Sequence, residues 1–340
     1  GEEKQEETIE KNEFPPQMQK ERSSDIEGKN QKEQQTGDDS QEMSASDMEA
    51  HDKEIKKQLN KEARQIMKET IHEKEGLIVH RPSFQGKTPE VRELHMQVMP
   101  IVESLSRQIL ELLDNEQTET YQKGKYEGQR FNASKVAYGD LRNFDKKNPP
   151  HEQPSLAVAV RIDESGSMIR DDRIEAAKKA AIAIAEFSKK VDIPLLIYGD
   201  TADRSSREKT SLFSYKEFED GFQWLNEKLV TMKPRQNNRD GAALRLAAEK
   251  LNRQSATTKL LLNISDGQPK ALPDYTGKKA KEDIQSVLKE YERQGILFVS
   301  AAIGQDKEEI KSIYGESRFV DITDLNEFPK QMIQLIVRYL

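Results

Sequence analysis

Residues 156–168 read LAVAVRIDESGSM, an apolar run followed directly by a short polar one. The first seven residues of this stretch are nearly all apolar, which is typical of a strand that a sheet buries on both faces. From here to the C-terminus, similar short runs alternate with amphipathic segments of helical length. This alternation predicts an α/β fold, in which a doubly wound, mostly parallel sheet carries helices on both faces.

The limits of these runs predict where the strands and helices begin and end. Gly295, for example, ends a helix just before the next apolar run. The expected strands are 156–162, 193–198, 209–215, 259–264, 296–303 and 318–322. The expected helices are 173–190, 216–230, 241–252, 280–294 and 325–339.

The N-terminal part of the chain differs in charge from the rest. Residues 1–50 contain 15 of the 61 acidic residues but only 6 of the 54 basic ones, so they carry −9 in a chain whose net charge is −7. They also have few large apolar side chains, so burial cannot offset the entropy lost on ordering them. We therefore expect a disordered acidic tail in this region.

The next hundred residues predict a helical region that leads into the α/β domain. An amphipathic pattern covers about 51–75, and Thr88 and Pro89 form an N-cap and first-turn pair that begins a second helix. The glycine-containing polar stretch 115–150 predicts a hairpin or loop, a short helix near 134–144 and a linker. The expected parts are therefore a disordered tail (1–50), a helical region with a Gly-rich turn and linker (51–150) and the α/β domain (151–340).

Composition excludes several classes of function. The chain has no cysteine, so it has no disulfide, thiolate zinc site, iron–sulfur cluster or cysteine nucleophile. No apolar run is long enough to span a membrane, and no signal peptide is evident near the start. The folded part is nearly neutral and has no basic stripe, which argues against nucleic acid as a partner. These features together predict a cytoplasmic protein.

Polar residues that could bind a cation follow the first strand directly. Asp163, Ser165 and Ser167 are two apart, so one carboxylate and two hydroxyls can face a single point, and Gly166 permits the tight turn between them. A point surrounded by such oxygen atoms, without His or Cys, suits Mg²⁺, Mn²⁺ or Ca²⁺. The motif is short enough to occur by chance, so its position relative to other polar loops decides whether it indicates a metal site.

Two more polar loops are expected at the same edge of the sheet. The strand 259–264 is followed by Ser265, Asp266 and Gly267, and the segment 237–244 begins a helix that should lie beside the same strand ends. Parallel α/β sheets bind their ligands at the carboxyl ends of the strands. Three oxygen-bearing loops at this edge predict a site.

These three pieces resemble the metal-ion-dependent adhesion site (MIDAS) of von Willebrand factor type A (vWA) domains, and the resemblance covers about Ser155 to Leu340. It implies that Asp163, Ser165 and Ser167 are metal ligands and that Asp266 acts directly or through water. The threonine of the family's second loop is replaced here. The resemblance implies Asn238 at that position, with Asp240 as an alternative oxygen donor.

The second loop also resembles a subgroup, the cobalt-chelatase T subunit and nitric-oxide-reductase activator D proteins. The residues that carry this resemblance are Asn238 to Leu244, Ser265 to Pro269, Asp274 to Gly277 and the region Gly124 to Phe144. It implies a non-catalytic adaptor for a MoxR-type AAA+ ATPase that inserts metal into, or activates, a target enzyme. In this reading, an Asp or Glu of a protein partner completes the shell of the bound metal.

Two alternatives remain at the level of sequence. Asp163 at the end of a strand could serve as the nucleophile of a Mg²⁺-dependent phosphohydrolase, although Ser165 stands where such enzymes have a second Asp. The domain could also be a structural, adhesion-type vWA module whose metal is incidental. Gly86, Lys87 and Thr88 hint at a phosphate-binding loop, but Arg81 occupies the position of its first glycine, so we prefer the helix N-cap.

Overall fold

The computed structural model describes the chain from residue 45 onward, with short gaps. The described ranges are 45–83, 86, 88–116, 121–125, 130–131, 144–147, 155–304, 307–322 and 324–340. The expected acidic tail lies outside the described residues up to 44, and its last six residues, 45–50, begin the first helix. The helix expected near 134–144 also lies outside them, except for Phe144, which begins a strand.

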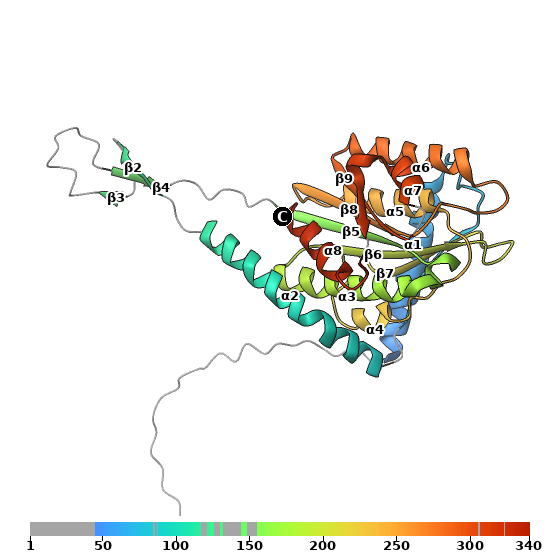
Figure 1. The fold of residues 1–340 in the computed structure, drawn as a ribbon, viewed down its shortest axis with the longest axis horizontal. Helices are drawn as coiled ribbons and strands as arrows, with labels where there is room; N and C mark the ends of the chain where they lie inside the picture. The colour runs from blue at the N-terminus through green and yellow to red at the C-terminus, as the bar shows by residue number, and fades with distance from the viewer. Residues whose placement is uncertain are drawn as a thin grey trace, which may run out of the picture. The chain divides into compact units, whose positions relative to one another are not determined.

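A seven-stranded sheet forms the centre of the fold (Figure 1), in the order β1-β7-β6-β5-β8-β9-β10. Strands β6, β5, β8, β9 and β10 run parallel, whereas β7 pairs antiparallel with β6 and parallel with β1. The predicted mostly parallel sheet is therefore confirmed. The strands are β1 (Leu77–His80), β5 (Leu156–Asp163), β6 (Leu195–Ala202), β7 (Thr210–Lys216), β8 (Thr258–Ser265), β9 (Ile296–Ile303) and β10 (Phe319–Ile322).

Helices cover both faces of this sheet, as predicted, and each face has its own apolar core. Alternate residues of β5 divide between them: Val158 and Val160 belong to one core, and Ala157 and Ala159 to the other. The first core contains α2 (Pro89–Glu116), α3 (Arg173–Val191), α4 (Leu225–Leu229) and α8 (Phe328–Val337). The second contains α1 (Ala45–Met67), α5 (Asp240–Asn252), α6 (Gly277–Glu292) and α7 (Lys307–Tyr314).

The region before the α/β domain contributes directly to these layers. Helix α1 packs on β1 and α5, and β1 adds a strand to the edge of the sheet beside β7. Helix α2 begins at Pro89 and packs on α3 and α8, and the Val91 amide donates to the Thr88 hydroxyl (3.4 Å), as expected of an N-cap. The apolar run at β1 is visible in the sequence, but no strand was predicted there.

The helix predicted over 216–230 is wrong in its extent, because only α4 is helical. Polar contacts hold the preceding residues in turns instead. The Asp220 carboxylate accepts from the Glu217 amide (2.8 Å) and from the Arg81 guanidinium (2.6 Å). Such side-chain bonds to the local backbone compete with helix formation. Helix α7 was not predicted, and it is only eight residues long.

Residues 115–150 include a small three-stranded antiparallel sheet, in the order β2-β4-β3, where the sequence predicted a hairpin or loop. Its strands are β2 (Tyr121–Lys125), β3 (Arg130–Phe131) and β4 (Phe144–Lys147). Among the residues that the structure describes, no helix is long and apolar enough to cross a membrane.

Candidate metal centre

The first loop of the site follows β5, the central strand of the sheet, which lies between β6 and β8. Asp163 is the last residue of this strand and is fully buried. Its Oδ1 accepts from the Ser165 amide at 2.7 Å, which folds the chain back after the strand. The Gly166 amide then donates to the Gln236 carbonyl at 2.7 Å and joins this loop to the segment before the second loop.

The two serines and Asp266 form a connected row of oxygen atoms. The hydroxyls of Ser165 and Ser167 are 3.0 Å apart, and the Ser167 hydroxyl donates to Asp266 Oδ1 at 2.7 Å. The other oxygen of Asp266 accepts from Arg173 at 2.8 Å. The structure thus brings together the first-loop residues and Asp266, which the sequence predicted to share one site.

The second loop places Asn238 and Asp240 differently. The Asn238 amide nitrogen donates to Asp240 Oδ1 (2.9 Å) and lies 3.4 Å from Asp163 Oδ2, while its oxygen accepts from the Lys270 amide (3.1 Å). Asp240 Oδ1 also accepts from Arg161 (2.8 Å), and its Oδ2 accepts from the Tyr314 hydroxyl (3.2 Å). Asn238 therefore stands beside Asp163, whereas both oxygens of Asp240 are held by protein donors.

Arg161 organises the charges beneath the site. Its fully buried guanidinium holds Asp200 through two bonds (2.5 and 2.9 Å), Asp240 through one, and the Asn263 side-chain oxygen through another (3.0 Å). None of these supporting residues was predicted from the sequence. Arg161 could have been recognised from the sequence, because it is a charged residue within an otherwise apolar strand and a buried charge requires a partner.

Acidic groups are in excess in this buried cluster. Its carboxyl groups are Asp163, Asp200, Asp240 and Asp266, and its guanidinium groups are Arg161 and Arg173, so acidic groups outnumber basic groups by two. Burial raises the pKa of Asp240 and of Asp266, and the neighbouring charge of Asp163 raises both further. Burial likewise raises the pKa of Asp200 despite its bonds to Arg161. A divalent cation would balance this excess.

The oxygen atoms open into a cleft of about 800 Å³. Ser165, Ser167, Asn238 and Asp266 are among the residues that line this cleft, and so are the basic residues Arg170, Arg173 and Lys270. Among the described residues, no group of three or more His, Cys, Asp or Glu side chains gathers as a metal site. A cation here would instead use two hydroxyls together with carboxylates, a set that suits a hard ion.

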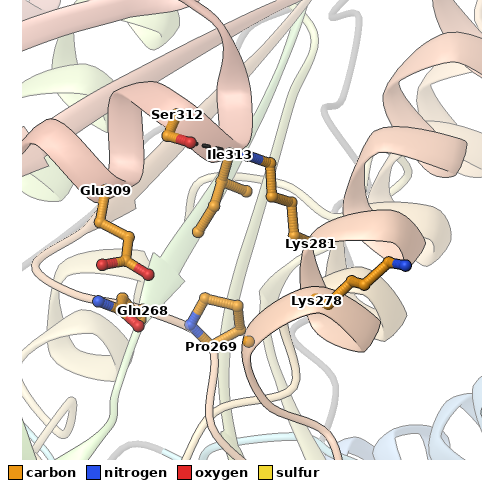
Figure 2. Close-up of a pocket in the computed structure, with 8 residues that line it drawn as sticks. Gln268, Pro269, Lys278, Lys281, Glu309, Ser312 and Ile313 are labelled. Atoms are coloured by element: carbon orange, nitrogen blue, oxygen red, sulfur yellow. Dashed lines mark hydrogen bonds between the residues drawn. The ribbon is translucent and has the colours of Figure 1, made fainter.

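A smaller pocket of about 190 Å³ adjoins the cleft and shares Gln268, Pro269 and Gly277 with it. Figure 2 shows Ile313 and Pro269 on opposite sides of this pocket and the Glu309 carboxylate at one end. The Lys281 ammonium is turned onto the Ser312 hydroxyl (2.7 Å). A peptide segment of a partner that bound in the cleft would therefore also contact this smaller, partly apolar pocket.

Glu164, between two of the predicted ligands, is also fully buried. Its carboxylate accepts from the Tyr215 hydroxyl (2.7 Å) and from Arg235 Nε (3.2 Å). Burial raises the pKa of Glu164 to about 7, although these two bonds act in the opposite direction. The group is therefore partly protonated near neutral pH in the metal-free protein.

We expect the raised pKa of Glu164 to make stability depend on pH. Between its unfolded value of 4.5 and about 7, the folded protein holds a proton that the unfolded chain has released, so the free energy of unfolding falls as pH rises. The loss reaches at most about 3 kcal/mol. Urea unfolding in chelator should show a flatter pH profile for Glu164→Gln than for wild type.

Glu308→Gln, on the exposed surface of α7, is the matched control and should keep the wild-type profile. Asp200 contributes a slope of the same sign, because its pKa is also raised, so the Glu164 variant should lose only part of the slope. A Glu164→Gln profile as steep as that of wild type would contradict the prediction.

The sheet order, the helices on both faces and the polar loops at one sheet edge define a vWA-type α/β domain. The von Willebrand factor type A domain family matches residues 158–334, slightly more than half of the chain. The chain belongs to this family. Its α1, β1 and α2 lie before the matched residues.

Among curated proteins, the chain is 24% identical to the uncharacterized protein YojO of Bacillus subtilis (strain 168) over 272 residues, 75% of this chain and 42% of that protein. It is 32% identical to the protein NorD of Stutzerimonas stutzeri over 105 residues, 31% of this chain and 17% of that protein. The matched part is less than half of each relative. The chain is thus a vWA protein that resembles NorD.

Among solved structures, the vWF domain of the type V pili tip protein Mfa5 from Porphyromonas gingivalis matches with a TM-score of 0.40 and 12% identity. The match covers 55% of this chain and 96% of that one.

Proposed function

We propose that the chain is a metal-dependent protein-interaction module that serves a MoxR-type AAA+ ATPase in metal insertion or metalloenzyme activation. The observation that carries this proposal is the buried excess of two acidic groups over basic groups, next to a row of hydroxyls that opens into a cleft. The similarity to NorD supports the choice of partner. We also propose a cytoplasmic location, which the absence of cysteine fits.

The proposed ligands are Asp163, Ser165, Ser167 and Asp266, with Asp266 binding directly or through water. Asn238 would join them if its amide turned to present its oxygen, because its nitrogen faces Asp163 here. Asp240 is better placed to hold Arg161 than to bind a cation. These ligands leave part of the shell of Mg²⁺, Mn²⁺ or Ca²⁺ to water or to an outside group.

An Asp or Glu side chain of the partner is the outside group that we propose. The basic side chains in the cleft walls, Arg170 and Lys270 among them, favour the approach of an acidic segment. A carboxylate on the metal forms a bond that exists only while the metal is present, so metal controls binding. This is an interaction function, and no step in it breaks a covalent bond.

The phosphohydrolase alternative receives no support from the geometry of Asp163. Its side chain is fully buried, and its two oxygens accept from the Ser165 amide, the Ser265 hydroxyl (3.0 Å) and, more weakly, the Asn238 amide. A nucleophile needs an accessible oxygen aimed at the substrate.

Pull-down of a MoxR-type ATPase from the same organism tests the proposal. We expect capture in Mg²⁺ and at least about 10-fold less in chelator, because the bond through the metal is lost. Ser165→Ala/Ser167→Ala should bind weakly under both conditions. Phosphatase turnover that is lost in Asp163→Asn would instead favour the alternative.

Ser106→Ala/Ser188→Ala is the matched control, because both serines are buried and no group in the described part of the chain hydrogen-bonds to their hydroxyls. It should bind like wild type and respond equally to chelator. Capture that is indifferent to both chelator and the Ser165/Ser167 change would rule out control by metal.

A further inference from the structure

The turn between α1 and β1, residues 71–76, lies against the second loop of the candidate site. His72 in this turn is 1% exposed, and its Nε2 lies 2.8 Å from Asp283 Oδ2 on α6. The Tyr275 hydroxyl donates to the same oxygen at 2.7 Å, and the Gly241 amide donates to the Tyr275 hydroxyl at 3.1 Å. A continuous chain of hydrogen bonds thus runs from the turn to the first residues of α5.

The chemical groups that take part in this series of hydrogen bonds determine which group donates in each bond. Burial alone would raise the pKa of Asp283, but the bonds from His72 and Tyr275 outweigh burial and hold the pKa below its usual value. The ionised carboxylate only accepts, so His72 Nε2 carries a proton and the Tyr275 hydroxyl points toward Asp283. The Tyr275 oxygen is then free to accept from Gly241, an amide of the first helical turn that has no partner within the helix.

The turn itself is fixed against the body of the domain. Gly76 has φ +53°, and a Cβ there would lie 2.1 Å from the Arg207 carbonyl oxygen, so only glycine fits. Glu75 approaches Arg239 of the second loop at 3.5 Å, and the Arg239 guanidinium lies over the Tyr275 ring, 4.8 Å from its centre. The turn therefore contacts the second loop by two routes.

The other end of the chain of bonds lies next to the site. A Cβ on Gly241 would lie 1.8 Å from Asp283 Oδ2 and 2.7 Å from the Tyr275 hydroxyl, so the helix start is packed directly on this pair. Asp240, the residue before it, bonds to Arg161 and Asn238, and the Asn238 amide nitrogen is near Asp163. A shift of Gly241 would displace this loop.

We propose that the turn 71–76 is a working part of the metal site, in which His72 is a positioning residue that holds the second loop through Asp283 and Tyr275. This inference rests on the proposed metal binding. The turn lies before the matched residues 158–334, so the vWA domain alone would lack this support. Apolar side chains could fill the same space at less desolvation cost, whereas a chain of directed bonds fixes the orientation of the loop.

Titration of the full chain with Mn²⁺, followed by the electron paramagnetic resonance of the free ion, tests this role. We expect His72→Ala and Tyr275→Phe each to weaken Mn²⁺ binding about 10-fold, the usual effect of removing a residue that orients metal ligands. Tyr275→Phe keeps the ring under Arg239 and removes only the hydroxyl. His72→Gln retains a side-chain N–H donor and should restore affinity to within about 3-fold of wild type.

Val79→Ala is the control for loss of packing, because Val79 is fully buried on β1 but has no bond to Asp283 or Tyr275. It should lower the melting temperature without changing Mn²⁺ affinity. Equal affinities of His72→Ala and wild type would overturn the inference, as would an equal weakening by Val79→Ala. Absence of Mn²⁺ binding by wild type would instead overturn the proposed metal function.

Hydrogen exchange in chelator gives a second readout that does not depend on metal. Peptides that cover residues 238–244 should exchange at least about 10-fold faster in His72→Ala and Tyr275→Phe than in wild type, because the bond to the Gly241 amide is weakened or lost. The same peptides in Val79→Ala should exchange at the wild-type rate. Unchanged exchange in the first two variants would show that the turn does not hold the loop.

Discussion

Replacing Arg161 with methionine is expected to lower the free energy of unfolding by about 3–5 kcal/mol, the usual cost of removing one partner from a buried ion pair. Methionine has a similar length but leaves Asp200 and Asp240 buried without their cation. Burial already raises the pKa of both carboxyls while Arg161 is present. The measurement is urea unfolding at neutral pH in chelator.

A rescue variant separates lost charge from lost packing. Arg161→Met/Asp200→Asn/Asp240→Asn removes the two carboxylates that lost their partner and should recover at least about half of the stability. The loss in the single variant should also shrink as pH falls, because protonation neutralises the same carboxyls. A single variant that loses less than about 1 kcal/mol at neutral pH would contradict this account of Arg161.

The central strands were predictable because burial on both faces leaves a nearly continuous apolar run. The apolar runs at β8 and β9 both stand out in this way, and polar residues flank each run. The approach of the first loop to Asp266 follows from this topology, because parallel strands end at one edge of the sheet. Local pattern and global fold agree for these elements.

The supporting residues were not predictable, because their roles depend on partners far away in the sequence. Asp240 looked like an oxygen donor for metal, but its partner Arg161 is 79 residues away. His72 lies 211 residues from Asp283, and nothing in its neighbours suggests a role. Strand β1 is only four residues long, and its partner β7 begins more than a hundred residues later. Hydrophobic periodicity indicates which residues of one segment are buried. It does not reveal contacts between residues that are far apart in the sequence.

Asp163→Asn should change stability in opposite directions with and without metal. In chelator the change removes one of four buried carboxylates, and the charge of Asp163 is one cause of the raised pKa of Asp240 and of Asp266. The metal-free variant should therefore be more stable than wild type by on the order of 1 kcal/mol above neutral pH. The asparagine oxygen can still accept from the Ser165 amide, so the loop keeps its fold.

With excess Mg²⁺ or Mn²⁺ the order should reverse. A ligand at 100 times its dissociation constant stabilises the folded state by about 2.7 kcal/mol, and only wild type should gain this, because Asp163→Asn removes the one carboxylate that is in contact with all three loops of the site. Asp192→Asn is the control: this exposed residue has φ +57°, which asparagine tolerates, and it lies at the C-terminus of α3. It should gain as much from metal as wild type. If Asp163→Asn gains equally, Asp163 does not bind the cation, and the excess charge beneath the cleft requires another explanation.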